Sequence, residues 1–274
     1  MPSDTGLRTS LDAPGSARIN VVRVLSLGGG GLRAAFEVPI LETLLAEHDY
    51  GLIMGISAGA VSEVQRPIAG VPGALALSHR PWQHLYSLGP LNERLDEGVS
   101  LDRLRNEFAC GVVVRETREF RLLAASDMID DRQLRAAILA SSSIAGLMPP
   151  VAFHGDGRVA SLYDGGHRHC VPPIPSARLP EVEHLDVVSC APLHQTEDDT
   201  HPVAHAMVWA FENHAEIAWQ LDLDRLMAIH RDRGISVHIY APAQPLGGMF
   251  DGRPATIESR IRQGEAALGQ PLEL

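Results

Sequence analysis

The stretch that decides the fold lies at residues 19–48 and reads INVVRVLSLGGGGLRAAFEVPILETLLAEH. Its first nine residues form a nearly continuous apolar run, which predicts a strand buried on both faces of a sheet. Four glycines follow this run, and residues 32–48 then place apolar side chains at helical spacing. Pro39 lies inside that helix and is expected to kink or interrupt it. The order of strand, glycine loop and helix predicts the first unit of a parallel sheet.

A second unit of the same kind follows directly. The sequence GLIMGISAGAVSEV, residues 51–64, holds a short apolar strand, a turn with Ser57 between Gly55 and Gly59, and the start of a helix. A Gly-x-Ser-x-Gly turn in this context can lift a serine hydroxyl to the carboxyl end of a sheet, beside the positive end of the helix. Ser57 is therefore a candidate nucleophile, and the alternative is an ordinary serine in a small-residue turn.

The rest of the chain continues the alternation of strands and helices. Strands are expected at residues 111–116, 119–126, 157–166, 184–192 and 235–242, and helices at residues 100–108, 130–143, 202–234 and 255–269. Residues 71–100 look less regular, with a short helix at 82–88. Residues 1–18 predict a flexible arm, and no linker divides residues 19–274, which are expected to form one α/β domain.

Composition excludes several classes of protein. The chain has 274 residues, of which 45% are hydrophobic and 21% charged, as in globular proteins. The formal net charge of −11 argues against a nucleic-acid partner and against long-range attraction to anionic membranes. Three scattered cysteines do not form a disulfide framework and favour a reducing compartment. The sequence shows neither a signal peptide nor a spanning segment of 18 apolar residues, so a cytoplasmic location is expected.

The glycine loop admits several interpretations. One is a flexible turn. A dinucleotide-binding loop would need a third glycine where Arg33 stands, and the Gly-Lys-Ser/Thr of a P-loop is absent. An oxyanion hole is favoured, because glycines leave backbone N–H groups exposed and a helix start adds unpaired donors. The expected site residues are Gly28, Gly29, Gly30, Gly31 and Arg33, the last to fix the loop or to meet a substrate anion.

The group that would activate Ser57 is less obvious. The chain has 13 histidines, but the histidine-containing α/β-hydrolase arrangement places several strands before its nucleophile, and here a single strand–helix unit precedes Ser57. The other candidate is Asp164, which ends a predicted strand and is followed by Gly165 and Gly166. By itself, Asp-Gly is typical of a turn. The adjacent HRHC, residues 167–170, is not expected to bind a metal, because four neighbouring side chains on an extended segment do not converge.

Taken together, three blocks in this order resemble those of the patatin-like phospholipase family. They are SLGGGGLRAA, GISAGA and YDGG, and weaker similarity extends the resemblance from about residue 20 to residue 268. The resemblance implies a three-layer α/β/α domain with a mainly parallel central sheet. It also implies a Ser57–Asp164 dyad, oxyanion donors in the glycine loop, and hydrolysis of lipid acyl esters without a cofactor, with transient contact to a membrane or micelle surface. Gly28, Ala34, His169 and Cys170 depart from the residues that the family often carries at their positions.

These departures keep two alternatives open. One is a catalytically inert protein that retains the fold and binds a lipid or a partner. The other is an acyltransferase that uses the same serine and passes the acyl group to an acceptor other than water.

Overall fold

The computed structural model describes residues 23–64, 76–77, 86–155, 158–193 and 206–274, so the arm predicted at residues 1–18 lies outside the described residues. The strands are β1 (Arg23–Leu27), β2 (Leu52–Ile56), β3 (Ala76–Leu77), β4 (Tyr86–Ser87), β5 (Glu107–Val114), β6 (Phe120–Ala124), β7 (Val151–Gly155), β8 (Arg158–Asp164), β9 (His184–Val188), β10 (Ser236–Tyr240) and β11 (Leu272–Glu273). The α-helices are α1 (Glu37–Glu47), α2 (Ala58–Val64), α3 (Gly89–Gly98), α4 (Asp131–Ser141), α5 (Ala206–Arg233) and α6 (Pro254–Leu268).

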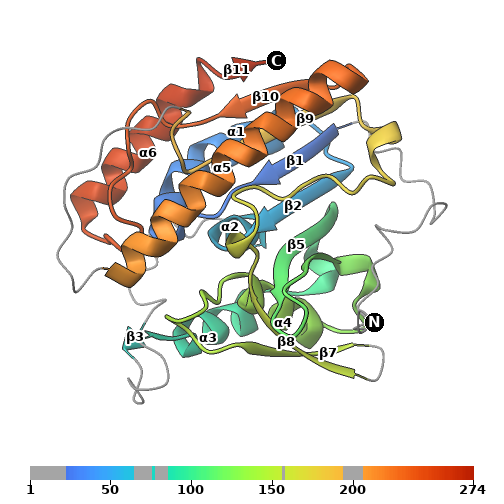
Figure 1. The fold of residues 1–274 in the computed structure, drawn as a ribbon, viewed down its shortest axis with the longest axis vertical. Coiled ribbons are helices and arrows are strands. Elements are labelled where there is room, and N and C mark those ends of the chain that lie inside the picture. The colour runs from blue at the N-terminus through green and yellow to red at the C-terminus, as the bar shows by residue number, and fades with distance from the viewer. Residues whose placement is uncertain (1–22, 65–75, 78–85, 156–157, 194–205) are drawn as a thin grey trace.

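The centre of the main sheet is parallel, as Figure 1 shows. Strand β1 pairs in parallel with β2 and β9, while β10 extends the parallel part beyond β9 and β5 extends it beyond β2. Antiparallel strands complete both ends, with β11 on β10, β6 and β8 on β5, and β7 on β8. The prediction of an α/β fold with a mainly parallel central sheet is confirmed.

Helices cover both faces of this sheet and make three layers. Side chains of successive strand residues point to opposite faces, so neighbouring positions join different clusters. Val24 and Leu52 pack in one cluster with Trp219 of α5, and Figure 1 shows α5 crossing that face. Leu25 and Ile53, one residue further on, pack in another cluster with residues of α1. Each central strand is therefore buried on both sides, which explains its nearly continuous apolar sequence.

The first helical segment begins as a 3-10 helix, Gly31–Phe36, and continues as α1. Pro39 thus lies in the first turn of α1, where a missing N–H leaves no hydrogen bond unmade. The helix changes from 3-10 to α at Phe36, three residues before the proline, and the backbone remains helical there, with φ −64° and ψ −35°.

The helix prediction at residues 100–108 was wrong, and the one at residues 82–88 falls mostly outside the described residues. Only Leu101–Arg103 form a helical turn, and β5 begins at Glu107. The Ser100 side chain makes no cap hydrogen bond, and the Leu101 N–H donates instead to Asp131 Oδ1 of α4, at 2.8 Å. Of the helix expected at residues 82–88, the first four residues lie outside the described part, and the next two form β4.

Helix α3 was not predicted. Pro90 lies in its first turn, and Leu91 and Leu95 are buried one turn apart. That spacing, together with a proline that favours the start of a helix, is the signal that could have revealed it.

Helix α6 packs directly on the segment that follows the glycine loop. It contacts both the 3-10 helix Gly31–Phe36 and α1. A Cβ atom at Gly264 would overlap the carbonyl oxygen of Phe36 and lie 2.8 Å from Pro39 Cγ. The glycine therefore sets how closely α6 approaches the start of α1.

Gly264→Ala is expected to lower the free energy of unfolding by about 3 kcal/mol, because the methyl group must push α6 away from Phe36. Helix propensity alone predicts the opposite sign, a gain of about 1 kcal/mol. Gly269→Ala is the matched control, since the nearest atom to its Cβ would lie 3.7 Å away. Denaturant titration of both variants is the measurement. Equal stability of the two would contradict the close packing of α6.

Candidate active site

Two strands meet end to end beside β5 and bring Ser57 and Asp164 together. Strand β2 runs parallel to β5 and ends at Ile56, which pairs with Gly111. Strand β8 runs antiparallel to β5 and ends at Asp164, which pairs with Val112. Strand β6 occupies the opposite edge of β5 at the same positions, so β2 and β8 share one edge. Ser57 directly follows Ile56 and therefore comes next to the end of β8.

Ser57 lies on a tight turn with a left-handed backbone. Its φ of 56° is unusual for a residue other than glycine. A Cβ atom at Gly55 would lie 2.5 Å from Ala60 N, and one at Gly59 would lie 2.6 Å from Gly28 O. The turn can close only because both flanking positions lack a side chain. This is the geometry of a strained nucleophile elbow between a strand and a helix.

The serine-rich end of α4 holds both candidate residues in place. Ser141 Oγ accepts a hydrogen bond from the Ser57 N–H at 3.0 Å and donates one to Gly111 O at 2.7 Å. The carbonyl oxygen of Ser143 accepts the Asp164 N–H at 2.9 Å. Sequence analysis missed these contacts, although a polar run at the end of a buried helix face is a signal that such residues have partners.

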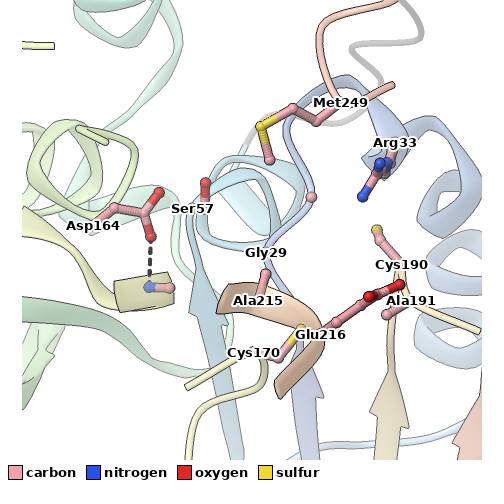
Figure 2. A pocket seen from close by; sticks show the side chains of 12 residues that line it. Gly29, Arg33, Ser57, Asp164, Cys170, Cys190, Ala191, Ala215, Glu216 and Met249 are labelled. Atoms are coloured by element: carbon pink, nitrogen blue, oxygen red, sulfur yellow. Dashed lines mark hydrogen bonds between the residues drawn. The ribbon is translucent and has the colours of Figure 1, made fainter. Parts of the chain in front are cut away.

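Asp164 is a fully buried carboxyl group that faces Ser57. Its Oδ1 accepts the Gly166 N–H at 2.7 Å, and its Oδ2 has no hydrogen-bond partner among the described residues. Figure 2 shows the carboxylate directed toward the Ser57 hydroxyl. Burial raises the pKa of Asp164 to about 7, against the opposing effects of the Gly166 N–H and the Ser57 hydroxyl. The hydroxyl is near enough to affect this pKa, but no hydrogen bond joins it to Oδ2.

The histidines next to Asp164 have other partners. His167 Nε2 accepts the Ala145 N–H at 2.9 Å, and burial lowers the pKa of His167 to about 4, so its ring is neutral. His169 Nδ1 lies 2.9 Å from Asp222 Oδ1. Neither histidine belongs to the described lining of the pocket around Ser57. Within the described residues, no cluster of histidine, cysteine or acidic side chains could hold a metal ion.

The glycine loop uses some of its N–H groups internally. The Gly28 N–H donates to Val188 O at 2.8 Å, and the Gly29 N–H donates to Cys170 O at 3.0 Å. For Gly30 and Gly31, no hydrogen bond from the N–H to another described residue is present. These two N–H groups therefore remain as candidate oxyanion donors, and Gly30 also belongs to the lining of the pocket around Ser57.

Asp222 of α5 supports the glycine loop from behind. This buried carboxylate accepts the N–H groups of Cys170 at 2.6 Å and Val171 at 3.1 Å. The Cys170 carbonyl in turn accepts the Gly29 N–H. Arg225, one turn along the helix, lies 3.0 Å from Asp222 Oδ1 and provides a compensating charge.

A small pocket of about 40 Å³ joins these groups. Its lining includes Gly29, Gly30, Arg33, Ser57, Asp164, Gly166, Cys170, Cys190, Ala191, Ala215, Glu216 and Met249. The pocket lies beyond the carboxyl ends of β1, β2 and β9. Along the chain, β2 and β5 are added on one side of β1, and the later strands β9 and β10 are added on its other side. The direction in which the sheet grows therefore reverses between β1 and β9. Open α/β sheets bind their ligands at such a switch point.

Comparison with known proteins gives little further guidance. No family model matches the chain, and no curated protein sequence matches it. Among solved structures, VipD from Legionella pneumophila is similar at 11% identity and a TM-score of 0.40, over 94% of this chain and 68% of VipD. This similarity is too weak to assign an activity. No helix in the described part of the chain has the length and apolar character needed to cross a membrane.

Asp164→Asn is expected to stabilise the protein more at pH 8 than at pH 5. The folded state raises the pKa of Asp164 to about 7, so the stability that its proton contributes is complete below pH ~4 and lost as the pH rises through 7. Asparagine cannot ionise and avoids this loss. The difference in free energy of unfolding between variant and wild type should grow by about 2 kcal/mol from pH 5 to pH 8.

Urea titrations at the two pH values measure this difference. Asp224→Asn, at an exposed position on α5, is the control for the loss of one carboxylate. A difference that stays constant for Asp164→Asn, or that changes equally for the control, would contradict the buried carboxyl group.

Proposed function

We propose that the protein is a patatin-type serine hydrolase that cleaves lipid acyl esters through a Ser57–Asp164 dyad. The observation that carries the proposal is the pair itself. A fully buried carboxyl group, one oxygen of which has no partner among the described residues, faces a serine on a left-handed turn, and both line one pocket. The resemblance of the glycine, serine and aspartate blocks to those of the family supports the same assignment.

In the first step, Ser57 Oγ attacks the ester carbonyl carbon and its proton passes to Asp164 Oδ2. A carboxyl group whose pKa lies near 7 suits this role, because it is substantially ionised at neutral pH and still basic enough to accept the proton. The negative charge on the carbonyl oxygen of the tetrahedral intermediate is stabilised by the N–H groups of Gly30 and Gly31. Preorganised donors of this kind contribute about 3 kcal/mol each to the transition state.

The tetrahedral intermediate collapses when the bond to the leaving alcohol breaks. Asp164 returns its proton to the departing alkoxide, which leaves as a neutral alcohol, and the acyl group remains on Ser57. In the second step a water molecule attacks the acyl carbon and gives its proton to Asp164. The bond to Ser57 Oγ then breaks, Oγ recovers the proton, and the carboxylic acid is released. These steps require neither a metal nor a cofactor.

The positions of the neighbouring groups suit this mechanism. Ser141 and Ser142 hold the backbone of Ser57, which keeps Oγ at the end of β2. Gly166 donates to Oδ1 and leaves Oδ2 for proton transfer. Arg33 lines the pocket, and its Nε donates to Gly247 O at 2.6 Å, which fixes the segment next to the glycine loop.

Hydrolysis of p-nitrophenyl butyrate tests the proposal. Ser57→Ala is expected to lower kcat/KM by about ten-thousand-fold, because the nucleophile is lost, and Asp164→Asn by about a thousand-fold or more. A fluorophosphonate probe should label wild type at Ser57 and fail to label Ser57→Ala. Ser100→Ala, where the side chain makes no cap hydrogen bond, is the control and should retain full activity.

The outcomes separate the three interpretations of the site. Equal hydrolysis by wild type and Ser57→Ala would refute the proposal. Absence of both hydrolysis and labelling would favour a non-catalytic lipid- or partner-binding protein with this fold. Faster transfer of the butyryl group to an added alcohol than to water, with Ser57 labelled, would favour an acyltransferase.

A further inference from the structure

Met249 reaches into the pocket from a loop near the C-terminus. Residues 246–251 are named the Met249 loop below. Figure 2 shows the Met249 side chain pointing from this loop toward Ser57 and Gly29. The residue is only 3% exposed, and it belongs to the lining of the pocket. Its thioether therefore occupies space that a substrate bound to Ser57 would need.

The Met249 loop is held by a buried arginine of α6. Arg260 is 1% exposed, and its guanidinium donates to the carbonyl oxygens of Leu246 at 2.9 Å, Gly248 at 2.8 Å and Asp251 at 2.8 Å. A fourth bond, at 3.0 Å, joins it to Leu32 O, next to the glycine loop. One side chain thus ties the Met249 loop to the segment that carries the candidate oxyanion donors.

Two more hydrogen bonds fix the same loop from the other side. The Leu32 N–H donates to Met249 O at 2.8 Å, and Arg33 Nε donates to Gly247 O at 2.6 Å. Moving the loop would remove three of the four acceptors of the buried Arg260 guanidinium, which is costly for a charged group. Met249 is therefore a fixed wall of the pocket.

The space left beside this wall is small. The pocket measures about 40 Å³, and Met249 belongs to its lining. During ester hydrolysis the alcohol leaves after the first step, whereas the acyl group stays on Ser57 through both steps. The acyl group is therefore the part of the substrate that stays next to Met249 for the longer time.

We propose that Met249, positioned by Arg260, limits the length of the acyl chain on Ser57 and so favours short-chain acyl esters. Among lipid and other acyl esters, those with short acyl chains are then hydrolysed faster than those with long ones. This inference rests on the proposed function and specifies the substrate class of the same site.

A series of p-nitrophenyl esters tests the limit, because only the acyl chain varies. Wild type should hydrolyse the butyrate with a kcat/KM about tenfold or more above that of the octanoate. Met249→Ala should raise octanoate hydrolysis by about tenfold and leave acetate hydrolysis within about threefold. Met227→Ala is the matched control, since Met227 is 50% exposed on α5, and its butyrate-to-octanoate ratio should equal that of wild type.

Two further variants test the proposal in case Met249→Ala does not fold. Met249→Val leaves a smaller cavity and should give an intermediate ratio. Arg260→Lys keeps the charge but cannot donate to four carbonyl oxygens from one planar group, so the Met249 loop should become more mobile. The butyrate-to-octanoate ratio of kcat/KM should then fall, while the fluorophosphonate probe still labels Ser57.

The results also distinguish this inference from the function on which it rests. A wild-type preference for octanoate, or an unchanged ratio in folded Met249→Ala and Met249→Val, would overturn the chain-length limit and leave the dyad intact. Failure to hydrolyse any ester and to label Ser57 would overturn both.

Discussion

The site depends on the junction of three strands at Gly111. Strands β2 and β8 approach one edge of β5 from opposite directions and end at neighbouring residues. A Cβ atom at Gly111 would lie 2.7 Å from Ile56 Cγ1 and 2.8 Å from Phe120 Cζ, so the strands can come this close only at a glycine. Ser141 then bonds both to Gly111 and to Ser57, which makes the position of the nucleophile a consequence of how the sheet is built.

Burial of Asp164 opposes stability and at the same time suits catalysis. Desolvation raises the pKa of this carboxyl group, and within the described part of the chain only Oδ1 receives a hydrogen bond. A carboxylate in water is too weak a base to deprotonate a serine effectively, so the same desolvation strengthens it. A functional site can carry an unfavourable local free energy when the surrounding fold is stable enough to maintain it. Here the buried strands and α4 provide that stability.

Sequence reasoning succeeded where a local rule applied and failed where the partner was distant. Runs of apolar residues predicted β1, β2, β9 and β10, and the Gly-x-Ser-x-Gly pattern predicted the turn around Ser57. Three polar residues on helices were not recognised, namely Ser141, Asp222 and Arg260, because each acts on backbone groups of a remote loop. The sequence shows that such a side chain is polar, but only the tertiary structure shows which backbone groups it binds. The helix expected at residues 100–108 failed for a related reason, since its last two residues, Glu107 and Phe108, pair with the distant strand β2 as the start of β5.

The central claim is that Ser57 carries the acyl group during turnover. The most direct measurement is peptide mass mapping after rapid acid quenching of the protein with p-nitrophenyl butyrate. The account predicts one butyryl group, on the peptide that contains Ser57, and none in Ser57→Ala. A butyryl group on Cys170 or Cys190, the two thiols that also line the pocket, or the same adduct in Ser57→Ala, would contradict it.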